Sequence, residues 1–241
     1  MKNTGERRAR LMTREELIIG GRSCVIYLTP APQYLLIQPV DDHDLAALEQ
    51  QVEYIRRNTD VSFALCAFVV DDWNLDLSPW PAPAVYGDAD FGGGAADTLH
   101  YVETVLLPEL RSCFAVGEDV KTVLGGYSLA GLFSIWCGYE TDLFTGIAAA
   151  SPSVWFDGWL EYAAEHEIQA KAVYLSLGDR EEKTRNRRMA AVGDCIRKQE
   201  EFLSASSVQC TLEWNPGNHF QDPGVRTAKG FVWAMSATTD Q

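Results

Sequence analysis

The chain has 241 residues, of which 46% are hydrophobic and 22% are charged, and its formal net charge is -14. This length can bury a sizeable core, and no linker-like or low-complexity stretch divides the chain. We therefore expect one domain over residues 1–241, with residues 1–12 flexible. The negative charge argues against nucleic acid or an anionic membrane surface as a partner.

The cellular location follows from what the sequence lacks. No signal-peptide-like apolar segment follows the basic start, and no later segment approaches the length of a membrane span. The six cysteines are scattered without a C-x-x-C pair, which favours reduced, buried thiols. We expect a cytoplasmic protein that does not bind membranes.

The first half of the chain shows apolar runs that alternate with a helical pattern. The expected elements, in chain order, are strands at 23–28 and 34–38, a helix at 44–57, a strand at 62–70, a long irregular segment at 71–94, and a helix at 95–114 with a kink or restart at Pro108.

The second half repeats the alternation. It predicts a strand at 120–124, a helix at 129–139, a strand at 146–150, a helix at 159–168, a strand at 172–177, a polar helix around 186–204, a strand at 208–214 and a last helix from about Val225. Such alternation predicts an α/β fold with a mostly parallel sheet, helices on both faces and sites at the carboxyl ends of the strands. Only about 20 residues separate the strands at 146–150 and 172–177, too few for a large cap domain.

The most informative motif reads GGYSLAG over residues 125–131, between a predicted strand and a predicted helix. A serine becomes a useful nucleophile only when a base removes its proton, and a tight strand-to-helix turn exposes the hydroxyl to that base. Gly126 gives the room that such a turn needs, whereas Ala130 stands where the usual pattern has its second glycine. We interpret Ser128 as a nucleophile, with an incidental serine in a glycine-rich turn as the alternative.

A serine nucleophile in such a sheet needs an acid and then a histidine after later strands. His219 lies in a turn after the predicted strand at 208–214 and is the candidate general base; a loop histidine that caps the last helix is the alternative. His100 and His166 fall inside predicted helices. His43 precedes the serine but follows the strand at 34–38, so it is a candidate for lining the site.

The candidate acid follows the predicted strand at 172–177, where the sequence reads GDRE. Its task is to accept the Nδ1 proton of the histidine and to stabilise the imidazolium that forms during attack. We favour Glu181, which stands three residues past the glycine that ends the strand, and we keep Asp179 as the alternative acid.

An oxyanion hole needs two backbone N–H groups that point at the charge developing on the substrate carbonyl oxygen. Leu129, the residue after the nucleophile, is expected to supply one. The second is expected from the loop after the strand at 34–38. Pro39 has no N–H, so Val40 is the first candidate and Asp41 the alternative.

Residues 125–156, which read GGYSLAGLFSIWCGYETDLFTGIAAASPSVWF, resemble the esterase D-type branch of the α/β-hydrolases. That branch includes siderophore (enterobactin) esterases, feruloyl-esterase-like proteins and S-formylglutathione-hydrolase-like proteins. The resemblance extends to residues 97–108, to the G-x-x-E that ends at Glu181 and to the Gly-Asn-His that ends at His219. It implies an α/β-hydrolase fold and hydrolysis of an ester or thioester, with Ser128 as nucleophile, His219 as general base and Glu181 as acid.

Aromatic residues suggest how the substrate is held. The candidates for substrate binding are Trp73, Trp80, Tyr127, Trp155 and His43, and the tryptophans could form an aromatic wall for an aryl or sugar-like ester, with packing against the sheet as the alternative. No set of His and Asp residues has metal-ligand spacing, so we expect no metal and no cofactor.

The leading hypothesis is a serine-dependent carboxylic ester hydrolase that acts through an acyl-enzyme on a small or aryl- or sugar-type ester. An acyltransferase with the same triad and a catalytically silent hydrolase-fold binding protein are the alternatives. The expected partner is a small-molecule ester, and whether the chain forms a homodimer is left open.

Overall fold

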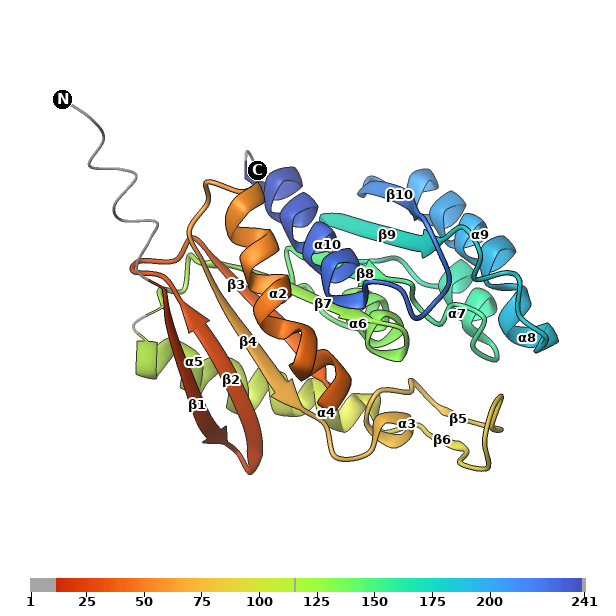
Figure 1. The fold of residues 1–241 in the computed structure, drawn as a ribbon, viewed down its shortest axis with the longest axis horizontal. Coiled ribbons are helices and arrows are strands. Elements are labelled where there is room, and N and C mark those ends of the chain that lie inside the picture. Colours follow the sequence, from red (N-terminus) through yellow and green to blue (C-terminus); the bar gives the residue numbers. More distant parts are fainter. Residues whose placement is uncertain (1–11, 115, 240–241) are drawn as a thin grey trace.

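The computed structural model describes residues 12–114 and 116–239. Their central feature is a twisted eight-stranded sheet with the strand order β1-β2-β4-β3-β7-β8-β9-β10 (Figure 1). Of the segment 1–12 that the sequence predicts to be flexible, only Met12 lies within the described residues, and it packs against the apolar core.

The sheet is parallel except at one edge. β1 pairs with β2 and β2 with β4 in antiparallel fashion, whereas every pairing from β4 through β3 to β10 is parallel. This confirms the predicted mostly parallel sheet, although β1 itself was not predicted. The strands are β1 (Thr13–Ile19), β2 (Arg22–Leu28), β3 (Tyr34–Val40), β4 (Phe63–Val69), β7 (Lys121–Tyr127), β8 (Gly146–Ala150), β9 (Ala172–Gly178) and β10 (Gln209–Asn215).

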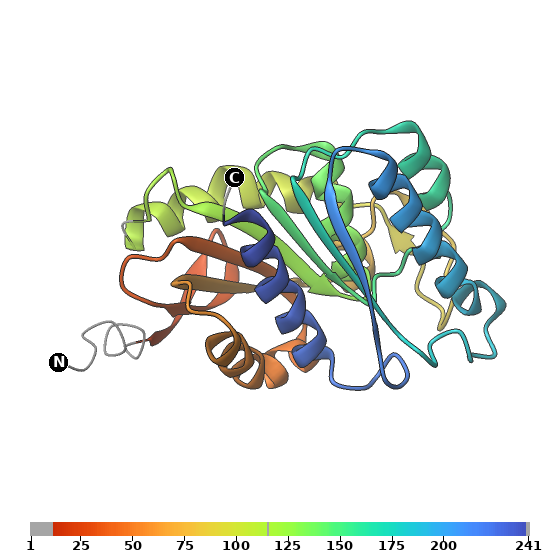
Figure 2. The ribbon, with the colours of Figure 1, turned by 90° about the horizontal axis from the view of Figure 1, so that it is seen from above.

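Helices cover both faces of the sheet, as predicted. Figure 2 shows α2 (Asp42–Asn58) and α10 (Pro223–Thr238) on one face, and the other main helices on the opposite face. The helices of the second face are α4 (Ala95–Tyr101), α5 (Leu107–Phe114), α6 (Leu129–Glu140), α7 (Trp159–Glu165) and α9 (Val192–Ala205).

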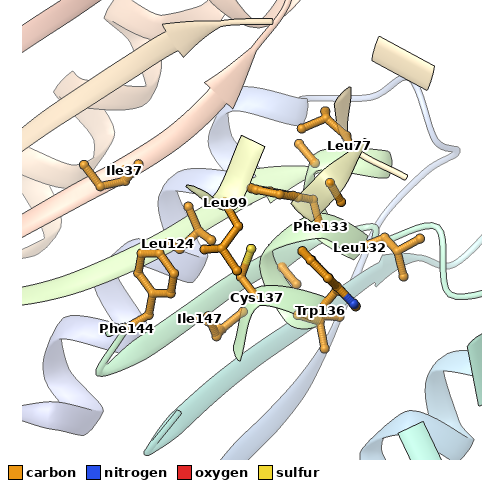
Figure 3. Packing of buried hydrophobic residues seen from close by; sticks show 14 of the residues in the cluster. Ile37, Leu77, Leu99, Leu124, Leu132, Phe133, Trp136, Cys137, Phe144 and Ile147 are labelled. Carbon is orange, nitrogen blue, oxygen red and sulfur yellow. The ribbon is translucent and has the colours of Figure 1, made fainter. Parts of the chain in front are cut away.

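Two apolar layers hold these helices to the sheet. On the α6 face, Leu132, Phe133 and Trp136 pack over Leu124 and Ile147 of the sheet (Figure 3). Every residue of α6 from Leu129 to Tyr139 is buried, which explains why its sequence is apolar all round. The nucleophile candidate Ser128 is thus attached to one of the most deeply buried helices of the molecule.

Two predicted segments differ from the structure. The irregular segment 71–94 contains a short helix, α3 (Trp73–Asp76), and a small hairpin of β5 (Pro81–Ala82) and β6 (Phe91–Gly92). The polar helix predicted at 186–204 is two helices, α8 (Arg187–Ala190) and α9, with a break at Ala191.

The predicted restart near Pro108 takes the form of a π-helical stretch, η1 (Val102–Leu106), between α4 and α5. Pro108 has no amide hydrogen for the carbonyl four residues earlier, so the regular α-helical ladder cannot continue through it.

The segment between β8 and β9 contains only α7, so the predicted absence of a large cap is confirmed. All six cysteines are free; Cys24, Cys66 and Cys137 are buried, whereas Cys113 is exposed. None of the helices in the described part of the chain is both long enough and apolar enough to cross a membrane.

Candidate active site

Ser128 occupies a sharp turn between β7 and α6, at the carboxyl edge of the sheet. Its backbone has φ 56° and ψ -118°, a conformation that non-glycine residues rarely adopt and that costs about 1–3 kcal/mol. Hydrogen bonds from its amide to the Ala150 carbonyl (3.1 Å) and from the Ser153 amide to its carbonyl (3.1 Å) hold the turn. The turn leaves Ser128 half-buried at the carboxyl end of β7.

The small residues around Ser128 let α6 approach β7 closely. A Cβ placed on Gly126 would lie 2.6 Å from the Cβ of Ala130 and 2.8 Å from its carbonyl carbon. The Ala130 methyl group is fully buried against this glycine. The turn therefore accepts alanine in place of the motif's second glycine because Gly126 leaves the space.

The imidazole of His219 bridges the serine and the glutamate. Its Nε2 lies 3.1 Å from Ser128 Oγ, and its Nδ1 lies 2.7 Å from Glu181 Oε2. Each of the three residues follows the end of a different parallel strand, β7, β9 or β10. The side chain of His219 is 26% exposed and that of Glu181 is 4% exposed, so solvent reaches the imidazole but hardly reaches the carboxylate.

Several donors surround the Glu181 carboxylate. Burial by itself would raise its pKa, but hydrogen bonds from His219, from the Ser151 hydroxyl (2.7 Å) and from the Gly178 amide (2.7 Å) lower the pKa overall. The alternative acid, Asp179, accepts a hydrogen bond from the Gly217 amide (2.8 Å) and has a half-exposed side chain. Of the two carboxylates, Glu181 is the one in contact with the imidazole.

The buried guanidinium of Arg226 on α10 joins the loops around the three residues. Its Nη1 donates to Glu181 Oε1 (2.9 Å) and to the Tyr127 hydroxyl (3.1 Å). Its Nη2 donates to the carbonyls of Pro216 and Asn218 (3.0 Å each), just before His219. Arg226 could not be predicted from the sequence, because its position in an amphipathic helix carries no motif.

Two aromatic rings lie close to the imidazole. The Tyr127 ring lies 5.1 Å from it, and the Tyr127 hydroxyl donates to the His219 carbonyl (2.7 Å). Burial and the nearby Glu181 carboxylate raise the pKa of Tyr127 to about 12, so the phenol keeps the proton that it donates. The Phe220 ring lies 5.6 Å from the imidazole, edge to face at 86°. Tyr127, predicted as a substrate contact, is thus buried and bonded to the backbone of His219, and Phe220 was not predicted as a site residue.

The two candidate oxyanion donors lie at the same edge of the sheet. Leu129 is the first residue of α6, so helix geometry leaves its amide without an intrahelical acceptor. Val40 ends β3, whose pairing with β7 stops at Ile37 and Leu124. Asp41 caps α2 by accepting the Asp44 amide through its side chain.

The remaining candidates for substrate binding have different neighbours. Trp80 donates through Nε1 to the Asp157 carbonyl (2.8 Å) and packs against the aromatic rings of Phe156, Trp159 and Tyr162. Trp155 packs against Phe91, and Trp73 begins α3. His43 is exposed in the first turn of α2. Most of the surface of Trp80 is thus buried, and its ring packs against other aromatic residues. This is the alternative to a substrate-binding wall.

The amino-acid sequence of the chain was compared with models of known protein families. Residues 56–219 match the model of the family described as "Putative esterase". The chain belongs to this esterase family. The match spans more than half of the chain and includes the residues around the Ser128 turn, Glu181 and His219. By sequence alone, no curated protein is recognisably similar to this esterase-family chain.

Solved structures share the fold of this esterase-family member. An IroE-like serine hydrolase from Shewanella oneidensis superposes with a TM-score of 0.72 at 16% identity, over 92% of this chain and 79% of that chain. Siderophore hydrolase EstA from Aspergillus nidulans gives 0.70 at 18% identity, over 99% and 98%. The enterobactin esterase FES from Shigella flexneri gives 0.66 at 16% identity, over 93% and 59%. These similarities establish an α/β-hydrolase fold.

Proposed function

We propose that this esterase-family protein is a serine-dependent carboxylic ester hydrolase in which Ser128, His219 and Glu181 form the catalytic triad. The observation that carries the proposal is the single imidazole that contacts both Ser128 Oγ and Glu181 Oε2. Family membership and the similarity to structures described as siderophore and enterobactin hydrolases support the same reaction class.

In the proposed reaction, His219 Nε2 takes the Ser128 proton while Oγ bonds to the ester carbonyl carbon. The amides of Leu129 and of Val40, or of Asp41, stabilise the oxyanion. The imidazolium then gives its proton to the alcohol oxygen as the carbonyl carbon–alcohol bond breaks, which leaves an acyl-enzyme. Water, activated by the same imidazole, releases the acid and restores Ser128. The Glu181 carboxylate holds the Nδ1 proton and stabilises the positive charge on the ring.

The environment of the base supports hydrolysis over transfer of the acyl group to a second alcohol. A transferase must keep water from the acyl-enzyme, yet His219 is partly exposed and no large cap covers the carboxyl edge of the sheet among residues 12–114 and 116–239. We propose a small or aryl- or sugar-type ester as the substrate. Product analysis in the presence of acceptor alcohols separates the two reactions.

A fluorophosphonate probe tests the proposal directly because it reacts only with an activated serine. We expect one covalent adduct on Ser128, located by peptide mass spectrometry, and loss of p-nitrophenyl acetate turnover in Ser128→Ala. Ser153 provides a matched control: its hydroxyl lies 3.4 Å from Ser128 Oγ, but no hydrogen bond from it to His219 is found. Ser153→Ala should still form the adduct. Absence of labelling in the wild-type protein would instead indicate a silent binding protein.

A further inference from the structure

Phe220 is the most exposed large apolar side chain in the described part of the chain, at 85%. It directly follows His219, and its ring meets the imidazole edge to face with 5.6 Å between centroids. Tyr127, the other ring beside the imidazole, is only 6% exposed and is hydrogen-bonded. The imidazole therefore has two neighbouring rings, one that belongs to the core and one that faces solvent.

The backbone that carries Phe220 is held in place on both sides. The Phe220 amide donates to Asn218 Oδ1 (2.9 Å), and the Asn218 amide donates to Gln221 Oε1 (2.9 Å). Arg226 Nη2 donates a hydrogen bond to the Asn218 carbonyl (3.0 Å). The apolar ring is thus presented from a braced turn beside the base, where a bound molecule can cover it.

The chemistry of the proposed reaction decides which part of a substrate would meet this ring. The imidazolium of His219 must give its proton to the departing alcohol oxygen, so the alcohol part of the ester has to lie against the imidazole. The acyl carbon is bonded to Ser128 Oγ and lies close to the oxyanion donors, so the acyl part of the ester extends away from the imidazole. A group attached to the alcohol oxygen is therefore the part nearest to Phe220.

We propose that Phe220 determines specificity for the alcohol part of the substrate and favours alcohols that carry an aromatic ring. This inference rests on the proposed esterase function. An aromatic ring stacked on Phe220 removes apolar surface of both groups from water and adds the attraction between aromatic rings. Because the alcohol leaves in the first half of the reaction, the preference should appear in acylation and not in deacylation.

The experiment compares kcat/KM for benzyl acetate and ethyl acetate, which share the acyl group and differ in the alcohol. In the wild-type protein we expect benzyl acetate to be preferred, and in Phe220→Ala we expect this preference to fall about tenfold, equivalent to about 1.4 kcal/mol. Phe220→Trp should retain the preference. The ratio for ethyl phenylacetate over ethyl acetate, which varies only the acyl group, should be unchanged.

Two controls separate the inference from damage to the site and from failure of the proposed function. The rate of Ser128 labelling by a fluorophosphonate should be the same in Phe220→Ala, because the departing fluoride has no ring to contact. Ile18→Ala removes another exposed apolar side chain, on β1 at the far edge of the sheet, and should change neither ratio. A wild-type protein that labels and hydrolyses esters, but whose benzyl preference survives in Phe220→Ala, would overturn the inference alone. A wild-type protein that neither labels nor hydrolyses would overturn the proposed function.

Discussion

The Arg226 guanidinium lies 2.9 Å from Glu181 Oε1, and the two side chains are 2% and 4% exposed. Burying both charges is costly, and the cost is offset only when further hydrogen bonds satisfy each group. Here the carboxylate also accepts from Ser151 and Gly178, while the guanidinium also donates to two carbonyls before His219. The pair therefore links the position of the Glu181 carboxylate to the position of the His219 loop.

Removing the cation should reveal this link. Arg226→Gln leaves the Glu181 carboxylate buried without its partner, so we expect the free energy of unfolding in urea to fall by roughly 3–5 kcal/mol. In the folded fraction, kcat should fall by about 100-fold with little change in KM, because the loop that carries His219 loses two hydrogen bonds. Arg197→Gln, at a half-exposed arginine of α9, is the control and should change both quantities little. Equal kcat values in Arg226→Gln and wild type would contradict the positioning role.

The two neighbouring carboxylates allow a matched test of the acid. Glu181→Gln keeps the size of the side chain but removes the charge that stabilises the imidazolium, so we expect kcat for p-nitrophenyl acetate to fall by roughly 10³- to 10⁴-fold. Asp179→Asn, two residues earlier, should retain kcat within a few-fold, because its side chain contacts the Gly217 amide and not the imidazole. If Asp179→Asn shows the larger loss, the assignment of the acid is reversed.

Most of the strands that could be predicted from the sequence are those with a continuous run of apolar residues. β3, β7, β8 and β9 are buried along almost their whole length and were found from their composition, whereas β1 exposes six of its seven residues and was missed. Its signal was the Gly20-Gly21 pair, where φ values of 55° and 89° form the two-residue turn of a hairpin.

Some residues of the candidate site could likewise be predicted from the sequence, and others could not. Ser128, Glu181 and His219 could be predicted because each lies within five residues of the end of a predicted strand, and parallel strands bring such ends together. Arg226 and Ser151 act through contacts across the sheet that no local pattern encodes. Phe220 was overlooked because an apolar residue in a loop is expected to pack inward, and only the structure shows its ring in solvent.

The lowered pKa of Glu181 predicts how stability depends on pH. A carboxylate whose pKa is lower in the folded state stabilises the protein above its ordinary value of 4.5, and this contribution is lost as pH falls through the folded-state pKa. Gln cannot titrate, so the stability difference between wild type and Glu181→Gln should be smaller at pH 3 than at pH 5. Urea unfolding at the two pH values measures this. Asp179→Asn, treated in the same way, gives the background for a half-exposed carboxylate. A difference that does not shrink would show that folding does not lower the pKa of Glu181.

The turn at Ser128 depends on space that Gly126 leaves, and a pair of substitutions can test this. In Gly126→Ala the new methyl group would lie 2.6 Å from the Ala130 Cβ and within 2.8–2.9 Å of the Ala130 backbone, so α6 must move. We expect this variant to lose about 1–3 kcal/mol of stability and most of its fluorophosphonate labelling, because Ser128 moves with the helix. Ala130→Gly restores the common motif, and we expect a cost of about 1 kcal/mol from the helical glycine, with labelling retained. The double variant should recover only part of the loss, because the backbone atoms of residue 130 still collide with the new methyl group. Full recovery would mean that the Ala130 side chain alone, and not the approach of the helix, sets the requirement for glycine at position 126.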